Sequence, residues 1–157
     1  MSHATEYYKK LFAPAPGNLC QIDATLWSQD ENISSEDNDD LTRPFSLEEI
    51  KKALFEMRSN RAPGPDNIPV EFYIYQHCWD VVGPDLFCLF EWFYEGKLDV
   101  QCLNYCIITL LPKSTYARKI QQYRPIYLLR CPYKLITKVM HLRVSKYVHK
   151  LFSIQQN

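Results

Sequence analysis

The spacing of apolar residues predicts a well-marked helix near the middle of the chain. It begins at Ser46, where Glu49 completes a capping-box pattern, and it must end before the two prolines of residues 62–65. Its inward stripe repeats at helical spacing and comprises Ile50, Ala53, Leu54 and Met57.

Three further helical patterns lie on either side of it. Residues 70–78 form one, and a second runs from Pro84 to Tyr94 with Gly96 as its stop. Residues 6–12 (EYYKKLF) predict a short amphipathic helix. The side chains expected to point inward from that short helix are Tyr7, Leu11 and Phe12.

The period of the pattern changes after residue 104. Residues 105–111 (YCIITLL) and 123–129 are apolar and β-rich, which predicts two strands. The polar, basic residues 113–122 connect them, so we expect a hairpin with a long tip.

Residues 133–151 return to helical spacing and predict a last helix. Its inward residues are expected to be Leu135, Ile136, Val139, Leu142 and Val148. Its largely outward residues are expected to be Lys134, Lys138, Arg143, Lys146 and Lys150. Helices, a β-hairpin and a further helix together indicate the α+β class.

Acidic and amide residues dominate the segment 22–41, which has no apolar period. We therefore expect residues 1–43 to be a partly disordered linker and residues 44–157 to be the folded domain. Asp37, Asp39 and Asp40 could in principle hold a divalent ion, but the segment lacks the turn glycine and closing Glu of a calcium loop. A solvated acidic segment is the preferred interpretation.

Charge divides the chain, although its formal net charge is zero. Residues 1–57 carry a net charge of −6 and residues 58–157 a net charge of +6. Between Val100 and Asn157 there are ten basic residues and no acidic one. Such a stretch favours phosphate backbones, and the alternative is a surface balanced by the acidic half.

The hairpin carries the first candidate chemistry. Lys113 ends the first strand and Arg124 begins the second, so both should lie at one end of the ribbon, with Arg118 and Lys119 in the tip. A point charge beside a planar guanidinium is what a triphosphate requires. The alternative is an ordinary basic hairpin tip.

The glycine–proline loop at 61–66 allows two interpretations. It could simply stop the preceding helix, with Gly64 permitting a positive φ. It could also be a stiff loop laid against a nucleic-acid backbone, with Arg61 on a phosphate.

Four sequence segments resemble the N-terminal part of the reverse transcriptase of non-LTR (LINE-type) retrotransposons, especially those of plants. They are SNRAPGPDNIPVEFY (59–73), IITLLPK (107–113), QQYRPIYLL (121–129) and YKLITKVMHLRV (133–144). The resemblance implies the fingers and the start of the palm of a right-hand polymerase. Asn67 stands where that family usually has Gly, although Asn also tolerates left-handed geometry, and Tyr127 replaces a small residue.

The resemblance also implies roles for individual residues. Lys113 and Arg124 would contact the phosphates of the incoming nucleotide. The residues expected near the template are Arg61, Pro63, Gly64 and Asp66. The residues expected on the nucleic-acid backbone are Arg118, Lys119, Lys134 and Lys138.

Catalytic carboxylates are not among these residues. In the resembling family two Mg²⁺ ions sit on aspartates of later motifs, whereas this sequence has no carboxylate side chain after Asp99. We therefore expect a fragment with no catalytic residue, metal site or cofactor, inactive by itself as an RNA-directed DNA polymerase.

Two alternatives keep the fold without the enzyme. One is a non-catalytic domain that binds an RNA or DNA template-primer. The other is a functionless retroelement remnant that self-associates through exposed core surface.

Apolar runs are too short for a membrane span, and cysteines without a C-x-x-C pair are typical of reduced, intracellular proteins. Nuclear and cytoplasmic locations are both compatible with the sequence.

Overall fold

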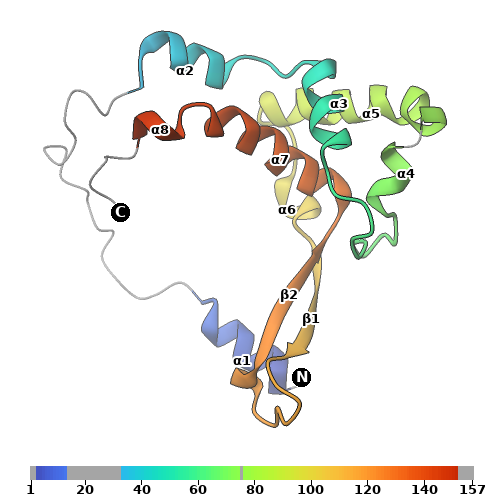
Figure 1. Ribbon diagram of the computed structural model, residues 1–157, viewed down its shortest axis with the longest axis vertical. Coiled ribbons are helices and arrows are strands. Elements are labelled where there is room, and N and C mark those ends of the chain that lie inside the picture. The colour runs from blue at the N-terminus through green and yellow to red at the C-terminus, as the bar shows by residue number, and fades with distance from the viewer. Residues whose placement is uncertain (1–2, 14–32, 75, 152–157) are drawn as a thin grey trace, which may run out of the picture.

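The computed structural model describes residues 3–13, 33–74 and 76–151 of the chain, and it has the predicted α+β architecture (Figure 1). Within these ranges two strands pair in an antiparallel hairpin. The helices are α1 (His3–Leu11), α2 (Ser35–Thr42), α3 (Leu47–Phe55), α4 (Val70–Ile74), α5 (Gln76–Tyr94), α6 (Val100–Leu103), α7 (Cys131–Ser145) and α8 (Val148–Leu151). The strands are β1 (Cys106–Pro112) and β2 (Tyr123–Leu129), with a 3₁₀ turn η3 (Ile120–Gln122) in the hairpin tip.

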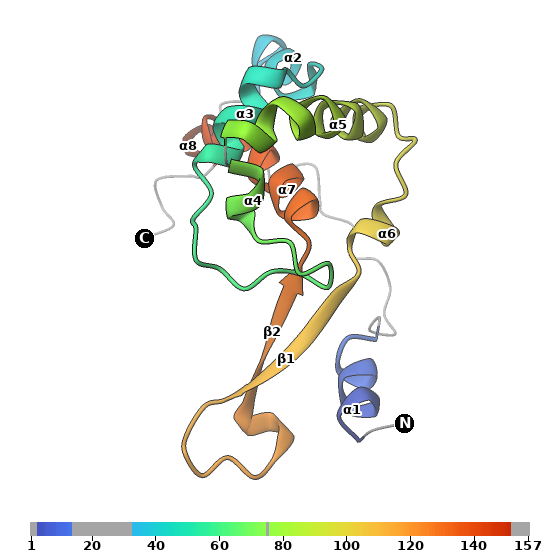
Figure 2. The same cartoon turned by 90° about the vertical axis from the view of Figure 1, so that its right-hand side faces the viewer.

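The hairpin extends away from the helices as a long ribbon (Figures 1 and 2). Helices α2, α3, α4, α5 and α7 gather at its base, where β2 leads directly into α7. Helix α1 lies beside the ribbon, and the Phe12 ring meets the Tyr127 ring of β2 at 6.2 Å between centroids. No helix in the described ranges has the length and apolar character to cross a membrane.

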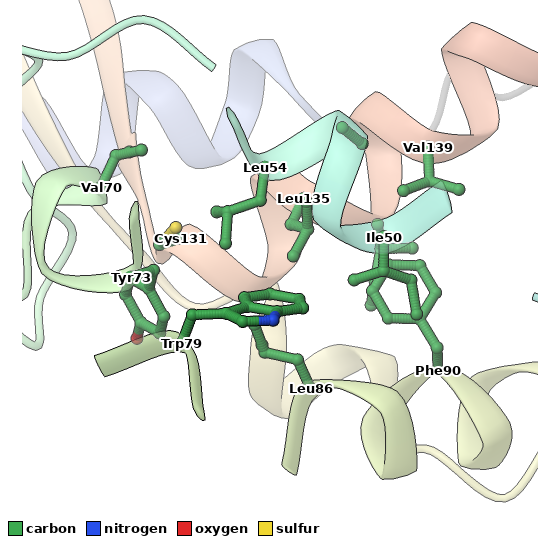
Figure 3. Packing of buried hydrophobic residues seen from close by; sticks show 12 residues of the cluster. Ile50, Leu54, Val70, Tyr73, Trp79, Leu86, Phe90, Cys131, Leu135 and Val139 are labelled. Carbon is green, nitrogen blue, oxygen red and sulfur yellow. The ribbon is translucent and has the colours of Figure 1, made fainter. Parts of the chain in front are cut away.

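The core lies where α3, α5 and α7 meet (Figure 3). The side chains that are fully buried there are Phe90, Ile50, Leu54, Leu135 and Val139. Each contributes roughly 1.5–3 kcal/mol through burial. Ile50 and Leu54 confirm the stripe predicted for the central helix, and Leu135 and Val139 confirm that of the last helix as far as Leu142. Met57 and Leu142 pack partly buried against the same cluster, whereas Val148 is only partly buried and does not belong to it.

The two helix ends around this core lie where the sequence predicted them, but only the Ser46 half of the capping box forms, because the Glu49 carboxylate pairs with Arg143. The Ser46 hydroxyl accepts a hydrogen bond from the Glu49 amide at 3.2 Å and begins α3. Helix α5 ends in a Schellman arrangement, in which Gly96 has a φ of 70° and its N–H donates to the Phe93 carbonyl. The N–H of Lys97 donates to the Trp92 carbonyl.

The structure differs from the sequence-based prediction in where two helices begin and end. A helix was expected to begin near Pro84, but α5 begins at Gln76 and contains Pro84 in its interior. Trp79 lies one turn before Gly83, and its indole packs against that glycine. Trp79 and Leu86 are both buried, so α5 is held in the core before and after Pro84. The last helix was expected to be continuous, whereas α7 ends at Ser145 and α8 begins at Val148.

Helix α2 corrects the expectation of an irregular segment at 22–41. Residues 14–32 lie outside the described part of the chain, but 35–42 are helical. The Ser34 hydroxyl caps the helix by accepting from the Asp37 amide at 3.1 Å, and carboxylates in the first turn suit the positive end of the helix dipole. Partners far along the chain then fix it: Asp37 pairs with Lys150 at 2.5 Å and Asp40 with Lys146 at 3.2 Å.

Helix α1 begins earlier than expected and turns a different residue inward. Tyr8 is buried, whereas Leu11 and Phe12 are more than half exposed and Tyr7 is half-buried. Helix α1 lies beside the ribbon (Figure 2), and Tyr8 lines a hollow together with Ile108 and Leu110 of β1.

Arg143 is the largest departure from the sequence-based expectation. It was placed outward, but only 4% of it is exposed. Its guanidinium donates to both carboxylate oxygens of Glu49 at 2.7 Å and lies 4.1 Å from the centre of the Phe45 ring. The main-chain carbonyls that it also reaches belong to Leu41, Arg43 and Pro44, at 3.2, 2.6 and 3.0 Å. Arg143 therefore joins α7 to α3 and to the segment before it.

Replacing Arg143 with Met should destabilise the fold by about 3–5 kcal/mol, because the largely buried Glu49 carboxylate loses its two short hydrogen bonds and keeps only Arg43, at 3.6 Å. Urea denaturation followed by tryptophan fluorescence measures this. The double variant Arg143→Met/Glu49→Met should recover most of the loss, since no unpaired charge then stays buried. As a control, Lys97→Met removes the exposed pair with Glu95 and should change stability little. A loss below about 1 kcal/mol for Arg143→Met would show that the pair is dispensable.

Candidate nucleic-acid interface

The register of the hairpin sets the position of the two cations predicted to bind phosphate. Leu111 pairs with Arg124, and beyond the last strand pair the Lys113 N–H donates to the Gln122 carbonyl at 2.8 Å. Because side chains two residues apart share a face, Lys113 and Arg124 project from the same face of the ribbon. Both are exposed. The prediction that the hairpin brings them to one end is confirmed.

Side-chain hydrogen bonds order the tip. The Gln122 side-chain oxygen accepts from the amides of Arg118 and Lys119 at 2.7 and 2.9 Å. The Lys113 ammonium donates to the Gln121 carbonyl at 2.8 Å. Since this last bond is exposed, an anion can exchange with it at little cost. Arg118 and Lys119 are exposed, and residues 113–124 contain no acidic side chain.

A cleft of about 540 Å³ lies at the base of the same ribbon, between β2, the start of α7 and the segment that follows α3. Four cationic side chains line it: Arg58, Arg61, Lys134 and Lys138. Its apolar lining comes from Met57, Val70, Ile126 and Leu128. Glu56 also lines the cleft, so four cations and one carboxylate surround its apolar residues. Cationic and apolar side chains together suit a chain of phosphates and bases.

The cleft and the tip cations share one face of the hairpin. Every second side chain of β2 points to the same side of the ribbon, and three of these are Arg124, Ile126 and Leu128. The step from Ile126 to Arg124 is about 7 Å, at 3.3–3.4 Å per residue. Helix α1 lies against the other face, where it forms a second hollow with Ile108 and Leu110. The front face therefore runs open from the cleft to the tip.

Two lysines of the cleft already have partners within the chain. The Lys134 ammonium donates to the Ala62 carbonyl at 3.3 Å, and Lys138 pairs with Glu56 at 3.3 Å. Arg58 and Arg61 are exposed. Sequence reasoning found Arg61, Lys134 and Lys138 but missed Arg58, which could have been noticed because it stands at the start of the same loop.

Gly64 holds the loop close to the hairpin, although not through the expected backbone conformation. Its φ is not positive; instead, a Cβ on Gly64 would lie 2.7 Å from the Leu129 carbonyl carbon and the Arg130 nitrogen. Only glycine allows this contact between loop and strand end. The left-handed residue is Asn67, with a φ of 56°, as its tolerance for that geometry predicted.

The remaining loop residues shape the segment that carries Arg61. The Asp66 carboxylate accepts from the Ile68 amide at 3.2 Å, which closes a tight turn after the partly buried Pro63. Before Arg61, Asn60 has a φ of 56° and its N–H donates to Glu71. That hydrogen bond lowers the pKa of Glu71. Pro63, Gly64 and Asp66 thus present Arg61 to the cleft, while contact of these three with a template stays a prediction.

Part of the basic half of the chain is balanced by the acidic half. Helix α2 pairs with Lys146 and Lys150, Glu49 of α3 pairs with Arg143, and Glu56, the C-cap of α3, pairs with Lys138. A hydrogen bond from Tyr147 and then contacts with Arg43 and Lys146 hold the pKa of Asp40 well below its usual range. For these four cations the alternative interpretation is therefore correct: their charge is balanced by the acidic half of the chain. In the described ranges no group of three or more His, Cys, Asp or Glu side chains could hold a metal ion.

Comparison with known proteins gives one relevant similarity. The chain is 32% identical over 157 aligned residues to the Transposon TX1 uncharacterized 149 kDa protein of Xenopus laevis. The alignment covers 98% of this chain but spans only 12% of that protein. No protein-family model matches the chain. The similarity supports a retrotransposon origin, while the expected likeness to plant elements stays a prediction.

Gly64→Ala should destabilise the protein by about 1–3 kcal/mol, because the added methyl group meets two backbone atoms that cannot rotate away. Urea denaturation measures the loss. Gly96→Asn is the matched control: nothing lies within 4 Å of a Cβ there, and Asn tolerates the φ of 70°. Equal stability of Gly64→Ala and the wild-type protein would contradict the close approach.

Stability should fall when the pH drops below about 4.5. Burial raises the pKa of Glu49, but hydrogen bonds and charge from Arg143 outweigh it, so the folded pKa lies below the ordinary 4.5. A hydrogen bond from Lys150 likewise lowers the pKa of Asp37. These carboxylates stabilise the fold above their unfolded pKa, and the contribution disappears as the pH falls through the folded pKa. Urea midpoints between about pH 3 and 7 test this, and midpoints that rise on acidification would contradict it.

Proposed function

We propose that this chain is a nucleic-acid-binding part of a retroelement reverse transcriptase, comprising fingers and the start of the palm. The observation that carries the proposal is the open front face of the hairpin, along which the cleft, Arg124 and Lys113 follow one another. The similarity to a transposon protein over 98% of the chain supports the retroelement origin in this proposal. The family motifs at 59–73 and 121–129 contribute the loop and the strand that form this face.

Each end of the face has its own task in this proposal. The cleft takes the template strand, with Arg58, Arg61 and Lys134 on its phosphates and Ile126 and Leu128 beneath the bases. At the tip, Lys113 and Arg124 bind the phosphates of a nucleotide about to be added. The spacing along β2 then sets the distance between template and nucleotide.

Polymerisation itself needs more than this face. Phosphoryl transfer in such enzymes uses two Mg²⁺ ions held by carboxylates, and this sequence has none after Asp99. Asp66 closes the loop turn and Asp99 caps α6 by accepting from the Gln101 amide at 3.0 Å. We propose that these 157 residues bind a template-primer without extending it.

A second candidate is a remnant without nucleic-acid function that self-associates. The observation that favours it is the apolar content of the front face, where Ile107, Leu111 and Ile126 are 46%, 49% and 39% exposed. Such residues can join two copies as readily as they can support bases.

Binding of the purified chain to a labelled RNA–DNA primer-template across a salt series separates the two candidates. Affinity should fall steeply with salt, and Lys113→Ala/Arg124→Ala and Arg61→Ala/Lys134→Ala should each weaken binding and reduce the salt slope by about two. Lys146→Ala/Lys150→Ala is the matched control, because α2 already neutralises these lysines. If the chain does not bind at low salt, the remnant without nucleic-acid function is the better explanation. The same holds if all three double variants weaken binding equally.

A further inference from the structure

The hairpin tip presents an aromatic ring that neither the motifs nor the proposed function explains. Tyr116 is 84% exposed, more than any other large apolar side chain in the described ranges. It stands between Lys113 and the adjacent pair Arg118 and Lys119. An aromatic ring left almost wholly in water has an unfavourable hydration that a partner can relieve.

The backbone around Tyr116 is fixed rather than loose. The Ala117 amide donates to the Ser114 carbonyl at 3.2 Å, which closes a turn with Tyr116 inside it. The hydroxyl of Tyr123, the first residue of β2, donates to the Ala117 carbonyl at 3.1 Å. Gln122 holds the next two amides. The ring is therefore presented on an ordered turn, which lowers the entropy cost of binding.

The charge around the ring selects the chemistry of the partner. The four cations of the tip, Lys113, Arg118, Lys119 and Arg124, are exposed, and residues 113–124 contain no carboxylate. An aromatic ring among cations is the arrangement that binds single strands, because bases stack on the ring and phosphates meet the cations. A continuous duplex offers only its backbone, since its base faces are already stacked.

We propose that Tyr116 is a stacking platform for an unpaired base of single-stranded nucleic acid, whose phosphates bind Arg118 and Lys119. This inference rests on the proposed nucleic-acid binding and adds a contact that distinguishes single strands from duplex. The tip then engages the unpaired strand, beyond the cleft at the base of the ribbon. A protein partner that uses Tyr116 and Arg118 as anchors is the competing occupant.

The test compares binding of the full chain to a single strand of about 12 nucleotides and to a blunt duplex of the same length. Tyr116→Leu removes the ring but keeps apolar bulk, and it should weaken single-strand binding roughly tenfold. It should leave duplex affinity and the salt slope unchanged, because no charge is removed. Tyr116→Phe should bind like the wild-type protein. Lys119→Ala should instead reduce the single-strand salt slope by about 0.7.

A fluorescent base analogue within the strand gives a second signal, since stacking on Tyr116 should quench it and Tyr116→Leu should restore it. The high exposure of Tyr116 means that its variants should unfold at the wild-type urea midpoint. Equal single-strand affinity of Tyr116→Leu and wild type, or equal losses on both ligands, would overturn the inference while the cleft still binds. Absence of any wild-type binding would overturn the proposed function together with it.

Discussion

The buried pairing of Arg143 with Glu49 is the constraint on which the helical base of the protein depends. A guanidinium with only 4% exposure is tolerated because each side of it meets a carboxylate, a carbonyl or the Phe45 ring. Those partners come from α3 and from residues 41–45, so satisfying one charge sets the path of the chain before α3. That path in turn brings α2 alongside α7 and α8, where its carboxylates find their lysines.

The hairpin depends on this base for its direction. Cys131 is buried at the junction of β2 with α7, and burial raises the pKa of its thiol to about 12. Gly64 presses the loop against the same junction, so ribbon, loop and helix meet where side chains leave little room. With α1 on one face, the opposite face alone is open between the cleft and the tip. The open surface of the ribbon is therefore set as much by the helix that covers its other face as by the residues on it.

Local signals in the sequence predicted what local physics controls. The β-rich runs marked β1 and β2, Ser46 marked the start of α3, and the hairpin placed Lys113 beside Arg124. Arg143 was misplaced because its position on the helix predicts exposure, and its partner stands 94 residues away. Helix α2 was missed for the same reason, since the lysines that hold it lie more than 100 residues later. Polar residues are assigned outward by default, and only distant partners can reverse that.

The separation between α3 and α7 also has a consequence for biosynthesis. A ribosome adding about 5–20 residues per second needs roughly 5–20 s to make the 94 residues from Glu49 to Arg143. During that interval the apolar stripe of α3 has no α7 to cover it, and the Glu49 carboxylate stays hydrated. The hairpin forms within microseconds once β2 has emerged, because its strands are neighbours in the chain. The nascent protein can therefore pair its ribbon before its core is complete, and α7 then stabilises both.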